Sequence, residues 1–318
     1  MSGACLSGGV ASLGSGSDTR ADVAIGEEDL DFVNFLRNVG AAHDTPHGGG
    51  TYGYGKTSLY SLSRVSTIIA DSQTTCDGSP VRRIMGCHLG DAFEADTDGV
   101  RRRFTGRHWW GRHDAEGGVE PLQGAEAVEL SKLLGLPSRD ESRPGTTIAI
   151  IAPHVDRGED LRAELVETVL WNFWPRMCSF TSPERKIEVS IEFEGEQVEI
   201  PEPESCPPLD LYAEALRNVR GEGDGEVTTI RSRKPIADLG RLSIVRGLNA
   251  PRNLMALREE SPMRQQAHAI ALMRPVELVV RYLPGESFAD KRFEWAGVFV
   301  CSEEDEIEKA FAVSEPRH

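Results

Sequence analysis

The chain has 318 residues, of which 35 are basic and 51 acidic, so its formal net charge at pH 7 is −16. This charge repels the phosphate backbone of nucleic acids, so nucleic acid is not the expected partner. No apolar run approaches the roughly 20 residues of a membrane-spanning helix, and the N-terminus lacks the basic region and apolar core of a signal peptide. We therefore expect a cytoplasmic protein without a membrane segment.

The length predicts two domains, at a prior of about 150 residues for each. Residues 1–28 are rich in glycine and serine and are predicted to be disordered. Residues 29–152 are predicted to form the first domain and 153–318 the second. Both domains mix helical and strand patterns, which predicts an α+β fold. The six cysteines include no C-x-x-C pair, so the sequence predicts no metal site.

Hydrophobic periodicity predicts the elements of the first domain. Helices are predicted over residues 29–39, over a short run directly after the glycine-rich segment at Gly48–Gly55, and over 124–134. The short helix is expected to face the core with Leu59, Leu62 and Val65, and the helix over 124–134 with Leu130, Leu133 and Leu134. Strands are predicted over 66–72, 82–89, 100–111 and 146–152, with a turn at 74–80 and an acidic loop at 91–99.

The second domain is predicted to begin with an amphipathic helix over 160–177. The apolar residues on its expected buried face are Leu161, Leu165, Val169 and Phe173. A hairpin with its turn at 194–196 and a helix over 209–219 follow. Strands are then predicted over 227–231, 240–246, 267–273, 277–283 and 294–301, and a helix over 304–312.

The most informative stretch is GGGTYGYGKTSLY, which runs from Gly48 to Tyr60. Glycine backbones adopt positive φ and let amide groups approach a ligand closely. A helix that starts after such a loop directs free N–H groups and the positive end of its dipole at an anion. The sequence therefore predicts a phosphate-binding site whose residues are Gly48, Gly49, Gly50, Gly53, Gly55, Lys56 and Thr57.

Residues Gly50 to Thr57 also match the spacing G-x-x-x-x-G-K-[ST] of the P-loop NTPases. In that interpretation Lys56 and Thr57 would serve phosphate and Mg²⁺. A P-loop directly follows a buried strand. Residues 41–47 are polar and contain a proline, so we expect an open loop and no strand before the glycines. A P-loop NTPase is therefore kept as the alternative.

Loop, short helix and strand in this order resemble the ATP lid of the GHKL ATPases, the superfamily of gyrase, the large heat-shock chaperone, histidine kinases and the mismatch-repair ATPase. The segment Gly145–Ile150, GTTIAI, is similar to the Gly-Thr strand that closes the nucleotide site of that superfamily. The resemblance implies ATP and Mg²⁺ as cofactors, a lid loop from Gly48 to Lys56 on the phosphates, and Thr146 at the adenine end. It also implies a partial sandwich, with a mixed sheet under helices, followed by a transducer-like α/β domain.

The catalytic residues of the GHKL family are not found in this sequence. In that family a helix with a Glu that activates water and an Asn that binds magnesium, and then an Asp-x-Gly turn, precede the lid. The predicted helix over 29–39 carries Asn34 and Asn38 without a Glu four residues before either. We therefore interpret the chain as an internal part of a GHKL-type protein that binds ATP weakly, does not hydrolyse it, and pairs with a missing upstream segment or a second copy. A non-catalytic interaction module is the remaining alternative.

Two further groups of residues are candidates for ligand binding. Arg274 lies between two predicted strands, and the resemblance implies that a basic residue of the second domain contacts the terminal phosphate. Basic and aromatic residues alternate in Arg101–Arg103 and Arg107–Trp110, a pattern found in proteins that bind single-stranded nucleic acid. Because alternate residues of a strand face opposite sides, we expect the arginines to be solvated and the aromatic rings to face the core.

Overall fold

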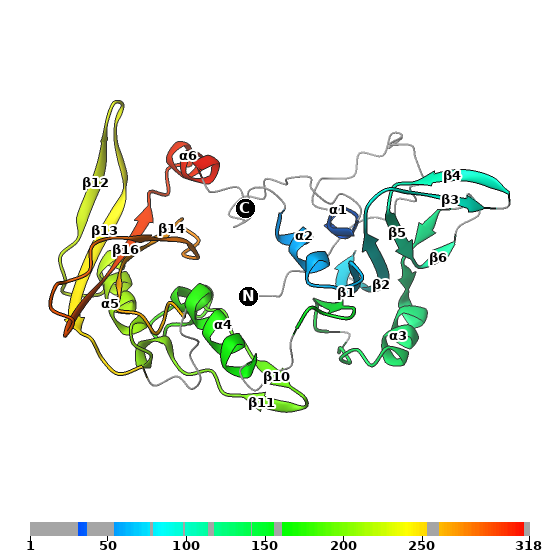
Figure 1. Cartoon of the computed structure of the whole chain (residues 1–318), viewed down its shortest axis with the longest axis horizontal. Helices are drawn as coiled ribbons and strands as arrows, with labels where there is room; N and C mark the ends of the chain where they lie inside the picture. Colours follow the sequence, from blue (N-terminus) through cyan, green and yellow to red (C-terminus); the bar gives the residue numbers. More distant parts are fainter. Residues whose placement is uncertain are drawn as a thin grey trace. The chain divides into compact units, whose positions relative to one another are not determined.

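The computed structural model of the chain describes residues 31–36, 54–76, 79–97, 99–113, 118–140, 142–155, 161–252 and 261–314. The described residues up to Val155 form one compact unit, the N-terminal unit, and those from Leu161 onward form a second, the C-terminal unit (Figure 1). None of the helices within these ranges is long and apolar enough to span a membrane.

The N-terminal unit is built on one antiparallel sheet. Its elements are α1 (Asp31–Leu36), α2 (Tyr54–Ser61), β1 (Thr67–Cys76), β2 (Ser79–Leu89), β3 (Phe93–Thr97), β4 (Val100–Phe104), β5 (Arg107–Trp110), β6 (Arg112–His113), β7 (Val119–Glu120), β8 (Leu122–Gln123), α3 (Gly124–Leu133) and β9 (Gly145–Ile150). The sheet has the strand order β5-β2-β1-β9, with β8 also paired to β2. All pairings described in it are antiparallel.

Helices cover both faces of this sheet. On one face α1 and α2 bury Phe32, Leu36 and Tyr60 against the strands, as Figure 1 shows for the two helices beside β1 and β2. On the other face α3 buries Ala127 and Ser131. We call these the α1/α2 face and the α3 face. Because successive side chains of a strand point to opposite faces, each strand contributes to both.

A buried ion pair fixes α3 to its face of the sheet. Nε and Nη2 of Arg82 donate to the two carboxylate oxygens of Asp71 at 2.9 and 2.6 Å, and the Asp71 side chain has 0% exposure. The hydroxyl of Ser131 donates to Asp71 Oδ2 at 2.8 Å and accepts from Arg82 at 2.9 Å. The negative charge of Asp71 on β1 is thus balanced by Arg82 on β2, and Ser131 of α3 completes the buried hydrogen-bond network.

The strands of this unit extend further than the sequence indicates. The predicted turn over 74–80 is wrong, because β1 and β2 pair through most of it. The predicted acidic loop over 91–99 is also wrong, because it contains β3, where Glu94 forms an ion pair with Arg101 of β4 at 2.7 Å. Opposite charges on paired strands favour the hairpin although acidic residues have low strand propensity.

Gly106 divides the predicted strand over 100–111 into β4 and β5. Its φ is +78°, and a Cβ atom at this position would lie 2.2 Å from the carbonyl oxygen of Asp91. Only glycine fits this conformation and this close approach. The chain therefore changes direction here, and β5 joins the main sheet while β4 pairs with β3.

Two of the predicted helix faces are wrong. Leu62 and Val65 follow the end of α2 and are 45% and 48% exposed. In α3, Leu133 and Leu134 are exposed, and the small polar Ser131 is buried in their place. The hydrogen bond between Ser131 and Asp71 determines which side of α3 faces the sheet. Hydrophobic periodicity cannot predict this, because it counts apolar residues only.

The C-terminal unit is built on a second sheet. Its elements are α4 (Leu161–Met177), β10 (Ile191–Phe193), β11 (Glu196–Val198), the short 3-10 helix η2 (Pro203–Ser205), α5 (Leu209–Arg220), β12 (Thr228–Arg233), β13 (Ile236–Leu248), β14 (His268–Met273), β15 (Val279–Pro284), β16 (Phe293–Cys301) and α6 (Asp305–Ser314). The five-stranded sheet has the order β12-β13-β16-β14-β15. It is mixed, because β14 runs parallel to β16 and the other pairs are antiparallel. The predicted α+β class is confirmed.

The core of this unit is centred on α4. Trp174 is fully buried, and its indole N–H donates to the hydroxyl of Tyr282 at 3.0 Å. That hydroxyl in turn donates to the carbonyl of Trp171 at 2.7 Å. The predicted face of this helix is therefore displaced: Leu165 and Phe173 are exposed, Leu161 and Val169 are half-buried, and Val166, Leu170 and Trp174 are buried.

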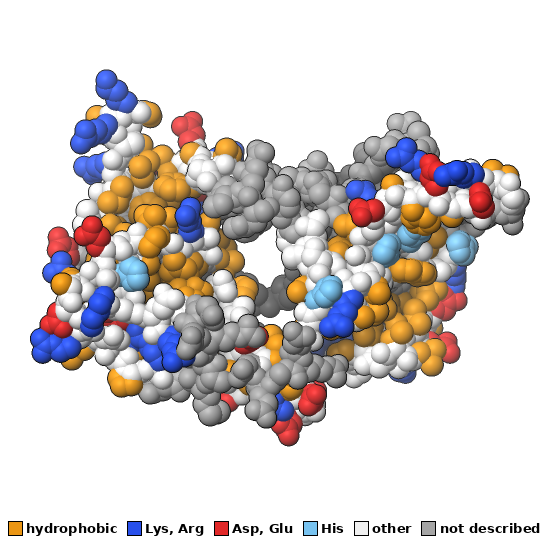
Figure 2. All heavy atoms as spheres, viewed as in Figure 1, with side chains coloured by type: hydrophobic (Ala, Val, Ile, Leu, Met, Phe, Trp, Pro, Cys, Tyr) orange, Lys and Arg blue, Asp and Glu red, His pale blue; other side chains and the backbone are white. Residues whose placement is uncertain are grey.

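The two faces of the second sheet are covered differently. α5 buries Leu216 and its neighbours against one face. On the opposite face α6 packs Phe311 against Phe299, with ring centroids 5.6 Å apart. Figure 2 shows hydrophobic side chains gathered over the strands of this unit, and Ile244 and Leu248 are 47% and 69% exposed. Within the described ranges, α6 therefore leaves part of this sheet face open.

Replacing Trp174 by alanine is expected to lower the free energy of unfolding by about 3–5 kcal/mol, because a fully buried aromatic ring leaves a cavity. The adjacent Phe173 is 39% exposed, so Phe173→Ala is the matched control. Its cost should stay below about 1 kcal/mol. Urea unfolding followed by circular dichroism measures both. Equal losses in the two variants would contradict this orientation of α4.

Asp71→Ala leaves Arg82 buried without its carboxylate, so we expect the free energy of unfolding to fall by about 3–5 kcal/mol. Glu94→Ala is the control, because its ion pair with Arg101 lies on the surface. An exposed pair contributes about 0–1 kcal/mol. Both variants are measured by urea unfolding at pH 7. A loss for Asp71→Ala as small as that of the control would show that the buried pair does not hold the unit together.

Candidate functional site

The predicted phosphate loop is described only at its end. Gly48, Gly49, Gly50 and Gly53, with the expected open loop at 41–50, lie outside the described residues. α2 begins at Tyr54, so Gly55, Lys56 and Thr57 form the first turn of a helix eight residues long. The side chain of Lys56 is also outside the described residues. Thr57 is half-buried and Gly55 is exposed.

The first turn of α2 carries backbone N–H groups that the hydrogen-bond ladder of the helix itself does not use. A helix satisfies its N–H groups only from the fifth residue onward, so those at its start have no partner within the helix. The hydroxyls of Ser58 and Ser61 donate to the carbonyls of Gly55 and Thr57, at 2.8 and 3.2 Å. Both hydroxyls therefore donate to carbonyl groups within the helix. The end of the helix carries a positive partial charge that suits an anion.

Thr146 lies on the same sheet as the strand that follows α2, as the sequence predicts. Gly145 is the first residue of β9, which pairs antiparallel with β1 so that Thr146 stands opposite Ser72. The two hydroxyl oxygens are 2.9 Å apart. Ser72 is 2% exposed, and Thr146 is half-buried. The expectation about the placement of Thr146 is confirmed.

Ser72 and Thr146 belong to the α1/α2 face. Ile68 and Ala70, which alternate with Asp71 along β1, are part of the core that α1 and α2 cover. Ser72 continues this row, four residues beyond Ile68, which corresponds to about 13 Å of strand. The α1/α2 face therefore presents an apolar end beneath Tyr60 of α2 and a hydroxyl pair further along the strands.

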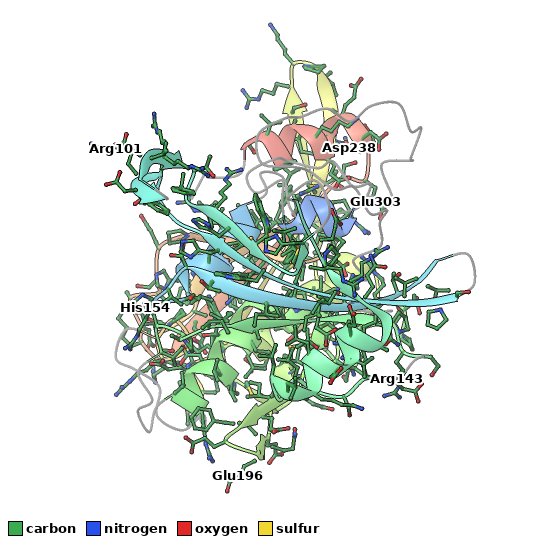
Figure 3. The ribbon with its side chains drawn as sticks, turned by 90° about the vertical axis from the view of Figure 1, so that its right-hand side faces the viewer. Arg101, Arg143, His154, Glu196, Asp238 and Glu303 are labelled. Atoms are coloured by element: carbon green, nitrogen blue, oxygen red, sulfur yellow. The ribbon has the colours of Figure 1, made fainter. Side chains whose placement is uncertain are left out.

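The chain before β9 is held by the α3 face. Gln73, which alternates with Ser72, donates from Nε2 to the carbonyl oxygens of Asp140 at 2.6 Å and of Arg143 at 3.4 Å. Arg143 is labelled in Figure 3. The backbone N–H and the hydroxyl of Ser142 donate to the Asp140 carboxylate and lower its pKa. The segment thus has a fixed course that delivers Gly145 to the start of β9.

Arg274, the predicted phosphate-contacting residue of the second domain, is engaged within the C-terminal unit. It follows β14, and its Nη2 donates to Glu308 of α6 at 2.9 Å. The Arg274 side chain is 12% exposed. Within the C-terminal unit the structure therefore gives this arginine a role in holding α6.

The cluster of basic and aromatic residues follows the expected separation into solvated arginines and buried aromatic rings only in part. Trp109 faces α1, and its indole N–H donates to the carbonyl of Leu36 at 3.3 Å. Trp110 is 52% exposed, so the expectation that both tryptophans face the core is wrong. Arg101 projects from the outer hairpin (Figure 3). Within the described ranges no group of three His, Cys, Asp or Glu is arranged to hold a metal ion.

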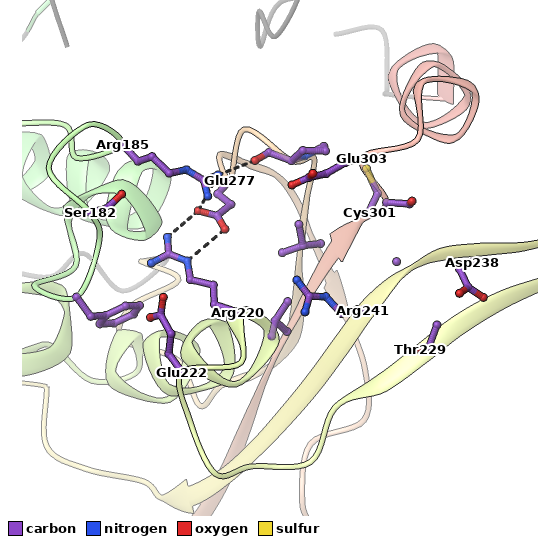
Figure 4. Close-up of a pocket in the computed structure, with 16 residues that line it drawn as sticks. Ser182, Arg185, Arg220, Glu222, Thr229, Asp238, Arg241, Glu277, Cys301 and Glu303 are labelled. Carbon is purple, nitrogen blue, oxygen red and sulfur yellow. Dashed lines mark hydrogen bonds and ion pairs between the residues drawn. The ribbon is translucent and has the colours of Figure 1, made fainter.

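A cavity of about 610 Å³ in the C-terminal unit was not expected from the sequence. α5, β12, β13, β16 and the turn between β14 and β15 surround it (Figure 4). The charged residues that line it are Arg185, Arg220, Glu222, Asp238, Arg241, Glu277 and Glu303. These residues lie in five separate segments, and no local spacing in the sequence connects them.

No protein-family model matches this chain, and no curated protein matches it either. The arrangement of the residues themselves therefore decides between the interpretations. A P-loop belongs to a parallel sheet in which a helix crosses from one strand to the next. In the N-terminal unit all described pairings are antiparallel, and α2 leads into a strand with antiparallel neighbours on both sides. This arrangement disfavours the P-loop interpretation.

Proposed function

We propose that the N-terminal unit is an ATP-binding module of the GHKL type. The observation that carries the proposal is the pairing of β9 with β1, which sets Thr146 beside Ser72 on the face that α1 and α2 cover. In this proposal the phosphates lie at the first turn of α2, and the adenine end lies near the hydroxyl pair. The nucleotide is bound on the α1/α2 face of the sheet.

In this proposal, backbone N–H donors and one cation bind the phosphates of ATP. The glycines of the segment Gly48–Gly55 allow backbone N–H groups to approach phosphate oxygens closely, because a glycine has no side chain in the way. The first turn of α2 adds its N–H groups and the positive end of the helix dipole. Lys56 contributes a full charge. Mg²⁺ is held mainly by phosphate oxygens and water in such sites and requires few protein ligands.

In this proposal, the adenine of ATP contacts hydroxyl groups at the edge of the apolar core. Thr146 and Ser72 each carry a hydroxyl with one donor and two acceptor lone pairs, the kind of group that hydrogen-bonds a ligand or an ordered water. The half-buried Ile148 and Ile150 alternate with Thr146 along β9 and support a flat apolar ring. Hydroxyls flanked by apolar side chains are typical of ligand sites in which a few polar groups fix the orientation.

The proposal assigns binding and no hydrolysis to the chain. The family's water-activating Glu and magnesium-binding Asn belong to a helix before the lid. The described part of α1, Asp31–Leu36, has the sequence DFVNFL and contains no glutamate. A missing general base typically lowers a rate by a factor of about 10²–10⁴. A module that binds ATP without turning it over is a regulatory or conformational element.

Thr146→Val should weaken ATP binding by a factor of about 3 to 10, because one hydrogen bond is lost while the shape of the side chain is kept. Thr147→Val is the matched control: the same change at the next residue, whose hydroxyl accepts from Arg139 on the α3 face. Calorimetric titration with ATP and Mg²⁺ measures both affinities. An equal effect of the two variants, or none for Thr146→Val, would sink the adenine-side assignment.

Purified protein is expected to release no phosphate from ATP above background, and Lys56→Ala is expected to abolish the remaining ATP binding, since the loop then lacks its only full charge. Lys132→Ala, at an exposed position of α3, is the control for an altered net charge. Phosphate release and titration are measured in parallel. Turnover that disappears with Lys56→Ala would show that the chain carries its own catalytic base, and the binding-only proposal would be dropped.

A further inference from the structure

Three arginines surround a single turn in the C-terminal unit. The turn is residues 275–277, between β14 and β15. Nη2 of Arg185 donates to the carbonyl of Pro275 at 2.8 Å, and Nη1 of Arg176 donates to the carbonyl of Val276 at 3.1 Å. Arg220 donates to the carboxylate of Glu277 from Nη2 at 2.6 Å and from Nε at 3.2 Å. Each arginine comes from a different segment, namely the loop after α4, the end of α4 and the end of α5.

This cluster carries more positive than negative charge. The carboxylate of Glu277 is paired with two of the three guanidinium groups, those of Arg185 at 3.3 Å and Arg220 at 2.6 Å. The Glu277 side chain is 6% exposed and that of Arg220 is 11% exposed. Burial, together with the charges of Arg185 and Arg220, lowers the pKa of Arg176. The Arg185 side chain lines the cavity and is 41% exposed, so part of its guanidinium group can reach an anion there.

The backbone of this turn is strained. Glu277 has a φ of +54°, in the left-handed region that residues other than glycine rarely occupy. Such a conformation costs about 1–3 kcal/mol and persists where the surroundings enforce it, often at ligand sites. Here the arginines enforce it by holding the carboxylate and the two preceding carbonyls. The turn is therefore preorganised around its cations.

The cavity of about 610 Å³ opens directly onto this cluster. Arg220, Glu277 and Arg185 are joined at one side of it, and Arg241 projects from β13 at another (Figure 4). Arg241 lies on the face that α5 covers, because Ser243, two residues further along β13, bonds to Asn218 of α5. Within the described ranges no side chain is bonded to the guanidinium of Arg241. Its charge is available to a ligand.

We propose that this cavity binds a small ligand through one anionic group, a phosphate or a carboxylate, held between Arg185 and Arg241 beside the Arg220–Glu277 pair. Guanidinium groups bind these planar or tetrahedral oxyanions through paired N–H donors. The volume lies within the range of about 300–1,000 Å³ that is usual for sites of small molecules. The hydroxyls of Ser182 and Thr229 line the same cavity and add neutral donors.

The acidic residues at the cavity restrict the ligand to one anionic group. Glu222 and Glu303 are exposed and line the cavity, and Asp238 is neutralised by Arg231 at 2.6 Å. A polyanion such as a nucleoside triphosphate would be repelled by the two free carboxylates. A monoanionic or zwitterionic metabolite would be repelled less, and an amine on it would be attracted by them. This site is therefore independent of the ATP site proposed for the N-terminal unit.

The proposal is tested by modification of arginines with phenylglyoxal on the full chain, with each arginine followed by peptide mass spectrometry. Inorganic phosphate and acetate are the probes, each compared with chloride at equal ionic strength. We expect one or both probes to slow the modification of Arg185 and Arg241 several-fold. Arg281, exposed on β15 and outside the cavity, is the internal control and should react at an unchanged rate.

Two variants show whether the protection arises at one site. In Arg185→Gln, protection of Arg241 should be lost, and in Arg241→Gln, protection of Arg185 should be lost, while circular dichroism remains that of the parent. Protection by phosphate alone assigns a phosphoryl ligand, and protection by acetate assigns a carboxylate. Equal rates with probe and chloride at both arginines, or an equal slowing at Arg281, would overturn the proposal. Protection of one arginine that persists after removal of the other would overturn it as well.

Discussion

The alternation of side chains along β1 is the constraint on which the N-terminal unit depends. Asp71 and Ser72 are neighbours in the chain, yet they serve opposite faces of the sheet. One binds Arg82 and Ser131 and so holds α3, and the other binds the strand that closes the sheet. A shift of register by a single residue would move the carboxylate into the apolar α1/α2 face. The buried charge therefore specifies the register more strongly than the apolar residues do alone.

Buried pairs of arginine and carboxylate recur in this acidic chain. Besides Asp71 with Arg82, the C-terminal unit buries Glu277 with Arg220 and Glu294 with Arg252, the last at 2.6 Å with 1% and 9% exposure. Such pairs contribute little net stability, because desolvation offsets the attraction, but they penalise every arrangement in which one partner is left alone. These pairs therefore specify which segments pack against each other. Glu294 also accepts from the backbone N–H of Ala267 at 2.8 Å, which fixes the chain ahead of β14 against β16.

The sequence identified most strands of the C-terminal unit and the strand that bears Thr146, because these combine β-branched residues with turn signals. It did not identify the rotation of the helices. In α4 the buried row includes Val166 and Trp174, one position away from the expected row, because Trp174 makes a specific hydrogen bond to Tyr282. In α3 a serine is buried. Periodicity counts apolar residues, whereas the partner across the interface decides which of them are covered.

The two candidate sites also differ in how a sequence reveals them. A glycine-rich loop before a helix is local, so its residues lie together in the chain and can be read from it. The arginine cluster around Glu277 assembles segments up to 100 residues apart, as in the bond from Arg176 to Val276, and no local pattern in the sequence marks it. The physical consequence is a difference in preorganisation. At the cavity, Arg185 and Arg220 are already held by the turn that they surround. These two guanidinium groups therefore lose little side-chain entropy when an anion binds beside them.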